Sequence, residues 1–272
     1  MPATPRQSSP PGRWIAASAR RGAALGACVL LAGFCPGAAP DARSEKSGNW
    51  DRIQDGEYLV ENCTWNVQAA RHPWRETIFC DPATGSRGWR WDFSGEDAAV
   101  KTYPEIIFGR KPFAVYTSTT ARLPAPLATA RFRLEYDYVA TAEGTYNTTT
   151  DISLTDSTNP GPENIRAKLM IWFDHRNMPF FDSPGMKRAV IGGRTHLVFI
   201  DRNHVGPEGQ WVFIALLPAD LPRRGELNLT DYFDYLLAEG ALKPEWFLSS
   251  IEAGSEIASG RGEITFKRFV VR

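Results

Sequence analysis

The sequence predicts an all-β domain, either a sandwich or a barrel. Short runs rich in β-branched and aromatic residues recur along the chain, and clusters of Gly, Pro, Asn and Asp separate them, as at residues 81–85, 159–162 and 206–209. No self-similarity is visible at the period of about 20 to 50 residues that would indicate a propeller or a solenoid. Residues 230–237 alone place apolar side chains at helical spacing, behind a possible cap at Thr230, and predict one short helix. The 272 residues suffice for one such domain and are too few for two enzyme domains.

The N-terminal residues predict an export signal. Arginines precede an apolar run over residues 23–34, and small residues with prolines follow it, which is typical of a secretory signal peptide. We therefore expect a signal peptide over residues 1–42, a short polar linker over 43–49 and the folded domain over 50–272, in a secreted or periplasmic protein. Adjacent arginines before the apolar run leave twin-arginine export open, and Cys28 leaves a lipoprotein anchor open.

Composition narrows the class of partner. Basic and acidic residues balance at 31 each, so the chain lacks the positive field that would attract nucleic acid or an anionic membrane surface. After the leader, no run of the sequence approaches the about 20 apolar residues of a membrane-spanning helix. We expect a monomer whose partner is uncharged or small, with no nucleic acid and no integral membrane segment in the mature chain.

The cysteines and histidines favour a disulfide over a metal site. Of the four cysteines, Cys63 and Cys80 remain in the mature chain, where an oxidising compartment allows them to pair. Closing that loop would stabilise the fold by about 3 kcal/mol in the chain-entropy model. The four histidines are scattered, and two cysteines without a nearby histidine pair lack the usual four-ligand spacing. We expect neither a metal nor a cofactor.

Alternation along three predicted strands places carboxylates and aromatic rings on polar faces. The run 151–155 turns Asp151 outward, and a C-terminal strand carries Glu252 and Glu256 on one face. The run 166–174 has a clean core face made of Ala167, Leu169, Ile171 and Phe173. Its other face carries Arg166, Lys168, Met170, Trp172 and Asp174. Because tryptophan is costly to expose without a use, we interpret these faces as the lining of a cleft.

Aromatic content indicates what such a cleft would bind. The chain has nine tryptophans, several of them in strand-like contexts. Sugar C–H faces stack on aromatic rings while sugar hydroxyls form hydrogen bonds with carboxylates, so this combination favours a polysaccharide or an oligosaccharide. The ordinary alternative is a solvated polar face, which antiparallel sandwiches commonly have.

Six segments in chain order resemble the motifs of glycoside hydrolase family 12, the endo-β-glucanase and xyloglucanase family. They are residues 60–65 (VENCTW), 101–104 (KTYP), 146–152 (YNTTTDI), 169–173 (LMIWF), 191–195 (IGGRT) and 246–256 (WFLSSIEAGSE). The resemblance implies a β-jelly-roll sandwich of two antiparallel sheets with a concave cleft, acting on a β-linked polysaccharide such as a β-glucan. It also places Cys80 where many family members have the partner of an early disulfide.

Carried over position by position, the resemblance assigns Glu256 as the general acid/base and Asp151 as its supporting carboxylate. Lys168 stands where the family has its nucleophilic glutamate, and Cys63 stands where it has a second sugar-binding asparagine. With the cleft faces above, the expected substrate-binding residues are Asn62, Trp65, Met170, Trp172, Asp174 and Glu252.

Lys168 conflicts with the ordinary reaction of the family. A retaining glycosidase needs two carboxyl groups about 5 to 5.5 Å apart, and one of them must form the glycosyl-enzyme. Lys168 cannot take that part, and an ammonium opposite Glu256 would lower the pKa of the group that must donate a proton.

Three hypotheses remain. The first is an inverting hydrolase, in which Glu256 is the acid and Asp151, Asp174 or Glu252 activates water. The second is a non-catalytic glycan-binding protein that keeps the cleft and pairs Lys168 with Glu256. The third is a lyase on a uronate-containing glycan, in which Lys168 neutralises the substrate carboxylate and a tyrosine or the lysine itself is the base.

Overall fold

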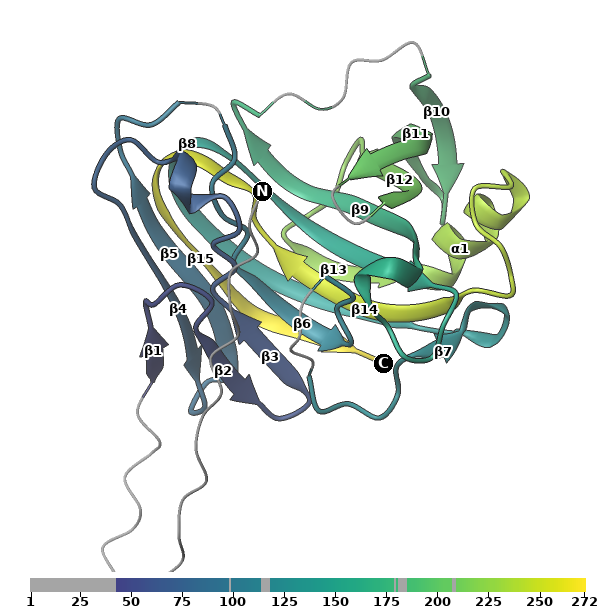
Figure 1. Cartoon of the computed structure of the whole chain (residues 1–272), viewed down its shortest axis with the longest axis horizontal. Helices are drawn as coiled ribbons and strands as arrows, with labels where there is room; N and C mark the ends of the chain where they lie inside the picture. The colour runs from purple at the N-terminus through teal and green to yellow at the C-terminus, as the bar shows by residue number, and fades with distance from the viewer. Residues whose placement is uncertain (1–42, 98, 114–117, 179, 181–184, 207–208) are drawn as a thin grey trace, which may run out of the picture. The chain divides into compact units, whose positions relative to one another are not determined.

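The computed structural model describes residues 43–272 except 98, 114–117, 179, 181–184 and 207–208, so the expected signal peptide lies outside the described residues. The expected all-β fold is confirmed (Figure 1). The strands are β1 (Ser44–Lys46), β2 (Arg52–Asp55), β3 (Tyr58–Glu61), β4 (Arg75–Asp81), β5 (Ser86–Phe93), β6 (Glu105–Gly109), β7 (Ala125–Pro126), β8 (Arg133–Thr155), β9 (Ile165–Arg176), β10 (Lys187–Ile191), β11 (Arg194–Gly206), β12 (Gly209–Pro218), β13 (Arg224–Asn228), β14 (Phe247–Gly254) and β15 (Ile257–Val271). The other described elements are α1 (Leu229–Ala238) and the 3-10 turns η1 (Val67–Ala69), η2 (Leu127–Thr129) and η3 (Pro162–Asn164).

Two layers of strands form the jelly roll, and the long strand β8 belongs to both (Figure 1). In the first layer the order is β1-β4-β5-β15-β8, with β13 paired to the start of β8. Beyond Tyr146, β8 pairs with β14 and β9 instead, and the second layer runs β2-β3-β6-β14-β8-β9-β12-β11-β10. Strand β12 pairs with β9 in parallel. Apart from isolated bridges, the other pairings among the described strands are antiparallel. Hydrogen bonding is therefore continuous from one layer into the other.

Two glycines allow β8 and β15 to approach each other where β8 changes layer. Gly144 has a φ of 101° and Gly260 a φ of 84°, both in the left-handed region that favours glycine. A β-carbon on Gly144 would lie 2.5 Å from the α-carbon of Gly260, so a larger residue would push the strands apart. Just beyond this contact, the backbone N–H of Asn147 donates to the carbonyl of Glu256 at 3.1 Å. The close approach thus brings the expected acid/base residue against β8.

The hydrophobic core uses the inward faces that the sequence predicts. Ala167, Leu169, Ile171 and Phe173 all belong to it, as expected for alternate residues of β9. The ring of Phe173 stacks on Tyr136 from the first half of β8, with centroids 4.8 Å apart. Because one face of β9 is committed to the core, its other face is left to line a cleft.

The predicted helix is confirmed as α1, and its expected cap is wrong. The buried residues of α1 are Leu229, Tyr232, Phe233 and Leu236, the i, i+3, i+4, i+7 spacing of one helical face. The N-cap position belongs to Asn228, because β13 runs up to that residue and the helix begins directly after it, so Thr230 lies inside the helix. Within the described ranges, no helix has both the length and the apolar character needed to cross a membrane.

Residues 43–49, expected to be a linker, contribute the edge strand β1. Ser44 lies opposite Cys80 and Lys46 opposite Ile78, so β1 pairs along β4. The guanidinium of Arg43 also lies 3.6 Å from the ring centroid of Phe79. An exposed edge strand pairs through its backbone, which a polar side-chain pattern does not reveal. The folded domain therefore begins no later than Ser44, ahead of the predicted boundary.

The expected disulfide is absent: Cys63 and Cys80 are both free and buried. Cys80 points into the hydrophobic core from β4. Cys63 follows β3 in the second layer and lines a pocket on the face of that layer opposite the core. The two thiols therefore face different environments and remain unbonded.

Candidate functional site

A pocket of about 280 Å³ opens over the second layer, on the face of β8 and β9 opposite the core. The residues that line it are Trp50, Cys63, Trp65, Tyr103, Lys111, Phe113, Asp151, Lys168, Met170 and Glu256. They come from the chain around β2 and β3, from both flanks of β6, from β8 and β9, and from the turn into β15. Five of the residues expected at a cleft, Trp65, Asp151, Lys168, Met170 and Glu256, are thus brought together from distant parts of the sequence.

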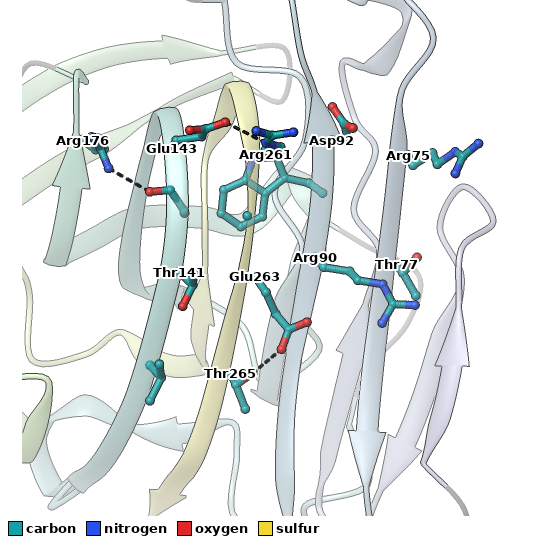
Figure 2. A pocket seen from close by; sticks show the side chains of 14 residues that line it. Arg75, Thr77, Arg90, Asp92, Thr141, Glu143, Arg176, Arg261, Glu263 and Thr265 are labelled. Atoms are coloured by element: carbon teal, nitrogen blue, oxygen red, sulfur yellow. Dashed lines mark hydrogen bonds and ion pairs between the residues drawn. The ribbon is translucent and has the colours of Figure 1, made fainter.

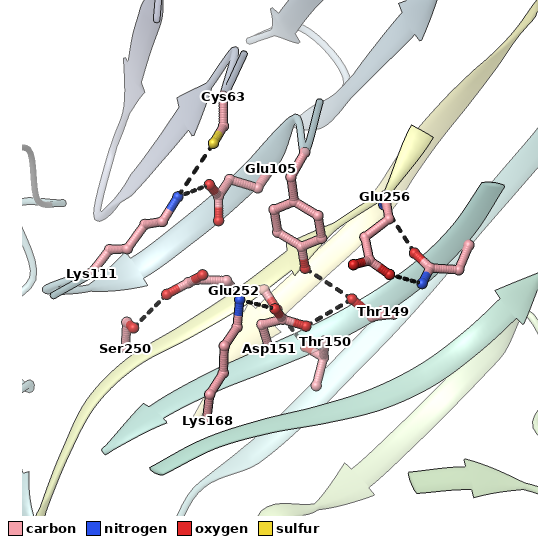
Figure 3. Close-up of polar contacts among 12 residues, drawn as sticks. Cys63, Glu105, Lys111, Thr149, Thr150, Asp151, Lys168, Ser250, Glu252 and Glu256 are labelled. Carbon is pink, nitrogen blue, oxygen red and sulfur yellow. Dashed lines mark hydrogen bonds and ion pairs between the residues drawn. The ribbon is translucent and has the colours of Figure 1, made fainter. Parts of the chain in front are cut away.

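Glu256 lies in the short turn between β14 and β15, where Asn147 holds it. Asn147 Nδ2 donates to Glu256 Oε2, and the backbone N–H of Glu256 donates to Asn147 Oδ1 at 2.9 Å (Figure 3). Burial and the charge of Asp151 raise the pKa of Glu256, while Asn147 and Lys168 lower it, and the net shift is upward. Lys168 thus lowers this pKa in the expected direction, but burial has the larger effect. A raised pKa suits a proton donor near neutral pH.

Lys168 pairs with Asp151, which corrects the expected pairing with Glu256. Lys168 Nζ lies 2.8 Å from Asp151 Oδ2, and Thr149 Oγ1 donates to Asp151 Oδ1 at 2.8 Å (Figure 3). In the register of β8 and β9, Asp151 lies opposite Met170, so Lys168 is its diagonal neighbour and a long side chain can reach it. Burial would lower the pKa of Lys168, but Asp151 and a second carboxylate behind it raise it, and the net shift is upward. The ammonium therefore stays charged at the pocket floor.

Beneath the pocket lies a buried charge cluster, which we call the floor cluster: Glu61, Glu105, Lys111 and Glu252. Lys111 Nζ lies 3.4 Å from Glu61 Oε1. It is also hydrogen-bonded to Glu105 Oε1 (Figure 3). The three carboxyl groups are at most 1% exposed. Burial raises the pKa of Glu105 well above its usual range. Lys111 lowers this pKa, while the nearby charges of Glu252 and Glu61 raise it further. Glu105 therefore keeps its proton to a higher pH than a free carboxyl group does.

Cys63 borders the floor cluster without acting as a nucleophile. Donor atoms of Glu61, Cys63 and Glu105 lie within 4.8 Å of one another, a spacing that would suit a metal ion. The ammonium of Lys111 supplies a positive charge at the same place, 3.8 Å from the sulfur of Cys63. Burial raises the pKa of the Cys63 thiol to about 12, so the thiol keeps its proton near neutral pH, unlike the low-pKa thiol of a nucleophilic cysteine.

Four residues expected at the cleft lie outside the pocket lining. Asn62 is fully buried and its amide donates to the carbonyl oxygen of Gly48 at 2.9 Å. Trp172 is only 2% exposed, because the ring of Phe180 packs against it with centroids 5.2 Å apart. Asp174 is paired with an arginine at 2.8 Å near the end of β9, and Glu252 belongs to the floor cluster.

The structure adds pocket residues that sequence reasoning did not single out, notably Trp50. Its φ of 60° is in the left-handed region, which is strained for a bulky residue, and such strain is common at ligand sites. The N–H of Trp50 donates to the carbonyl of Asn62 at 3.0 Å, so Asn62 holds the turn that presents this ring. Trp50 is 39% exposed and Trp65 is 51% exposed, which leaves two rings available at the pocket mouth. Trp50 directly follows the turn-forming sequence Ser-Gly-Asn, which is the one sequence signal that could have indicated its role in the pocket.

A larger hollow of about 990 Å³ lies on the outer face of the first layer, away from this chemistry (Figure 2). Its charged side chains pair across strands, as Arg261 does with Glu143 at 2.7 Å. Its one aromatic lining residue among those described, Trp91, is only 4% exposed. Because none of its described lining residues presents an exposed aromatic ring, this surface has the character of a solvated sheet face.

Comparisons with known proteins agree with the fold. The sequence is 28% identical to endoglucanase S of Pectobacterium parmentieri over 228 residues, 81% of this chain and 84% of the relative. It is 24% identical to the xyloglucan-specific endo-beta-1,4-glucanase A of Emericella nidulans over 238 residues, 85% of this chain and 92% of the relative. The fold is similar to that of a family 12 xyloglucanase from Bacillus licheniformis, with a TM-score of 0.76 and 24% identity, covering 84% of this chain and 99% of that one. No family model matches the sequence.

The jelly roll, and the pocket that joins two carboxyl groups to exposed tryptophan rings, are consistent with the glycoside hydrolase class to which the relatives belong. The similarity to endoglucanases and xyloglucanases extends along most of the chain. In sequence and fold this chain is therefore similar to the glycoside hydrolases of family 12.

Proposed function

We propose that this chain is an exported hydrolase of a β-linked polysaccharide, a β-glucan or a close relative, and that it works with inversion at the anomeric carbon. Glu256 is the general acid and Asp151 is the base that activates water. One observation carries the proposal: Asp151 and Glu256 line the same pocket as the exposed rings of Trp50 and Trp65. The names of the relatives, an endoglucanase and a xyloglucan-specific glucanase, support the substrate class.

Asp151 is the best placed of the three carboxylates considered as the base. Asp174 is bound to an arginine outside the pocket, and Glu252 belongs to the floor cluster and does not line the pocket. Asp151 lines the pocket itself. In the proposed step, water oxygen bonds to the anomeric carbon while Asp151 accepts a water proton, and Glu256 gives its proton to the departing glycosidic oxygen, which takes the electrons of the broken bond.

Lys168 occupies the position that corresponds to the nucleophile of family 12, and its positive charge affects the activation barrier of the proposed reaction. An isolated ammonium about 4 Å from a developing oxocarbenium charge would raise the barrier by about 4 kcal/mol at an effective dielectric constant near 20. The partner carboxylate of Asp151, 2.8 Å from Lys168 Nζ, offsets part of that repulsion, and its contribution falls as it takes up the water proton. A glycosyl-enzyme is excluded at this position because lysine carries no carboxylate, whereas hydrolysis through water stays open.

Lyase chemistry receives less support. Burial and the charges of Asp151 and Glu105 raise the pKa of Tyr103 well above its usual value, and the pKa of Lys168 is also raised. Both groups hold their protons more tightly than free side chains, so neither is a suitable base.

A non-catalytic glycan-binding protein is the second candidate. The ion pair of Lys168 with Asp151 favours it, because water activation requires Asp151 to remain accessible beside its partner. Such a protein would bind an oligosaccharide without releasing product.

The deciding experiment measures new reducing ends from β-glucan and xyloglucan, with the anomeric form of the fresh product followed by NMR. We expect inverted products, and a kcat about 100-fold or more lower in Glu256→Gln and in Asp151→Asn, as for loss of a general acid or base. Asp174→Asn is the matched control and should leave turnover unchanged.

Unchanged turnover in Glu256→Gln would contradict the assignment of the acid. Binding by calorimetry without any product would select the second candidate. Export and a monomeric state are part of the proposal, and cell fractionation with size-exclusion chromatography of the mature chain tests them.

A further inference from the structure

Asn147 and Glu256 share a closed set of three hydrogen bonds. The N–H of Asn147 donates to the Glu256 carbonyl at 3.1 Å, the N–H of Glu256 donates to Asn147 Oδ1 at 2.9 Å, and Asn147 Nδ2 donates to Glu256 Oε2. The amide therefore uses both its oxygen and its nitrogen on one residue. Because a flipped amide would turn its NH₂ group toward the N–H of Glu256, the orientation of Asn147 is fixed.

These bonds distinguish the two oxygens of the Glu256 carboxyl group. Oε2 accepts a hydrogen bond from the side-chain amide of Asn147, so a carboxylic hydrogen on Oε2 would compete with that donor. The carboxylic proton therefore belongs on Oε1. Asn147 itself is fully buried, whereas Glu256 lines the pocket, so the fixed side of the carboxyl group is the buried one.

We propose that Asn147 is a positioning residue for Glu256: it holds the carboxyl group in one orientation and reserves Oε1 for the proton that passes to the substrate's leaving oxygen. The inference rests on the proposed function of Glu256 as the general acid. When the O–H bond of Glu256 breaks and the leaving oxygen gains the proton, the carboxylate that remains is stabilised by the hydrogen bond from Asn147 Nδ2 to Oε2.

The surrounding backbone is built to hold this contact. Gly144 and Gly260 bring β8 and β15 together three residues before Asn147 and four after Glu256. The neighbours of the pair, Thr148 and Ser255, are fully buried, with hydroxyl oxygens 3.3 Å apart. A positioning residue requires such support, because its effect depends on sub-ångström geometry.

Several charged or titratable groups face Glu256 and must be considered with Asn147. Asp151 from β8 raises the pKa of Glu256 and Lys168 from β9 lowers it. Tyr103, just before β6, and Lys111, just after it, line the same pocket. The hydrogen bond from Asn147 lowers the pKa of Glu256, so its removal should raise that pKa while the other groups stay in place.

The test combines NMR titration of the Glu256 side-chain carboxyl carbon, assigned by its loss in Glu256→Gln, with the pH profile of hydrolysis. We expect Asn147→Ala to move the Glu256 titration and the basic limb of the kcat profile to higher pH. We expect kcat to fall about 10- to 100-fold, with KM within about threefold, as for a misplaced catalytic group. Asn147→Asp keeps the acceptor for the N–H of Glu256 and serves if the alanine variant does not fold; its two carboxyl groups should titrate in coupled steps.

Asn228→Ala is the matched control, because it removes an amide–carboxylate bond of 2.7 Å, to Asp231, away from the pocket. It should leave the Glu256 titration unchanged. A folded Asn147 variant whose Glu256 titration and pH profile match the wild type would overturn the inference. A shifted titration in a protein that hydrolyses nothing would support the positioning role while removing the proposed function, so the two failures are distinguishable.

Discussion

Replacement of Glu76 by glutamine should remove a large part of the pH dependence of stability. Glu76 lies in β4 and is 1% exposed, and its Oε2 accepts a hydrogen bond from Thr102 at 2.6 Å. Burial raises its pKa from 4.5 to about 8, against a smaller lowering by Thr102. Glutamine keeps an acceptor for Thr102 and never ionises. The buried carboxyl group is therefore compared with a neutral group of the same shape.

The sign follows from proton linkage. A folded-state pKa above the unfolded value means that the folded state binds the proton more tightly, so this stability is present below pH 4.5 and is lost as the pH rises to about 8. At about 1.36 kcal/mol per pH unit, the loss reaches about 3 kcal/mol by pH 7 and about 5 kcal/mol above pH 8. Chain termini and other carboxyl groups titrate in both proteins and cancel in the difference.

Urea denaturation of wild type and Glu76→Gln at pH 5, 6, 7 and 8 measures that difference. We expect the unfolding free energy of Glu76→Gln to increase steadily relative to that of the wild type as the pH rises. A difference in unfolding free energy that stays constant over this range would refute the reasoning, since it would mean that Glu76 titrates normally in the folded protein.

Four further predictions concern the pocket and the cysteines. Lys111→Met should lower the unfolding free energy by about 3 to 5 kcal/mol, because it removes the cation bonded to buried Glu105 and leaves buried Glu61 with the more distant Arg52, at 3.7 Å. In chemical denaturation, Lys187→Met at an exposed pair should cost less than about 1 kcal/mol. Lys168→Glu should change the product anomer from inverted to retained, as followed by NMR, and persistent inversion would argue against Lys168 as the block to a glycosyl-enzyme. Trp50→Ala should weaken oligosaccharide binding by about 0.5 to 1.5 kcal/mol in calorimetry, whereas Val190→Ala, at an exposed position outside the pocket, should not. Cys63 and Cys80 should react with a thiol reagent only after unfolding, and a reductant should leave the melting temperature unchanged.

Side-chain periodicity was sufficient to predict much of the fold. Because strand residues alternate between faces, the core positions of β9 from Ala167 to Phe173 could be named in advance, and the helical spacing within α1 was equally readable. Backbone pairing leaves no such trace. The edge strand β1 has exposed polar side chains throughout, and only its hydrogen bonds to β4 reveal it.

Residue type and chain order also indicated the central site residues, Glu256, Asp151 and Lys168, and the family whose motifs surround them. Their electrostatic relations required coordinates, because a pKa depends on burial and on the nearest charge rather than on sequence neighbours. Only the tertiary structure pairs Lys168 with Asp151 and leaves Glu256 to Asn147. It also separates Cys63 from Cys80, although their positions in the mature chain had suggested a bond. The sequence determined which chemical groups this protein carries, and packing between β8, β9 and β15 decided which of them interact.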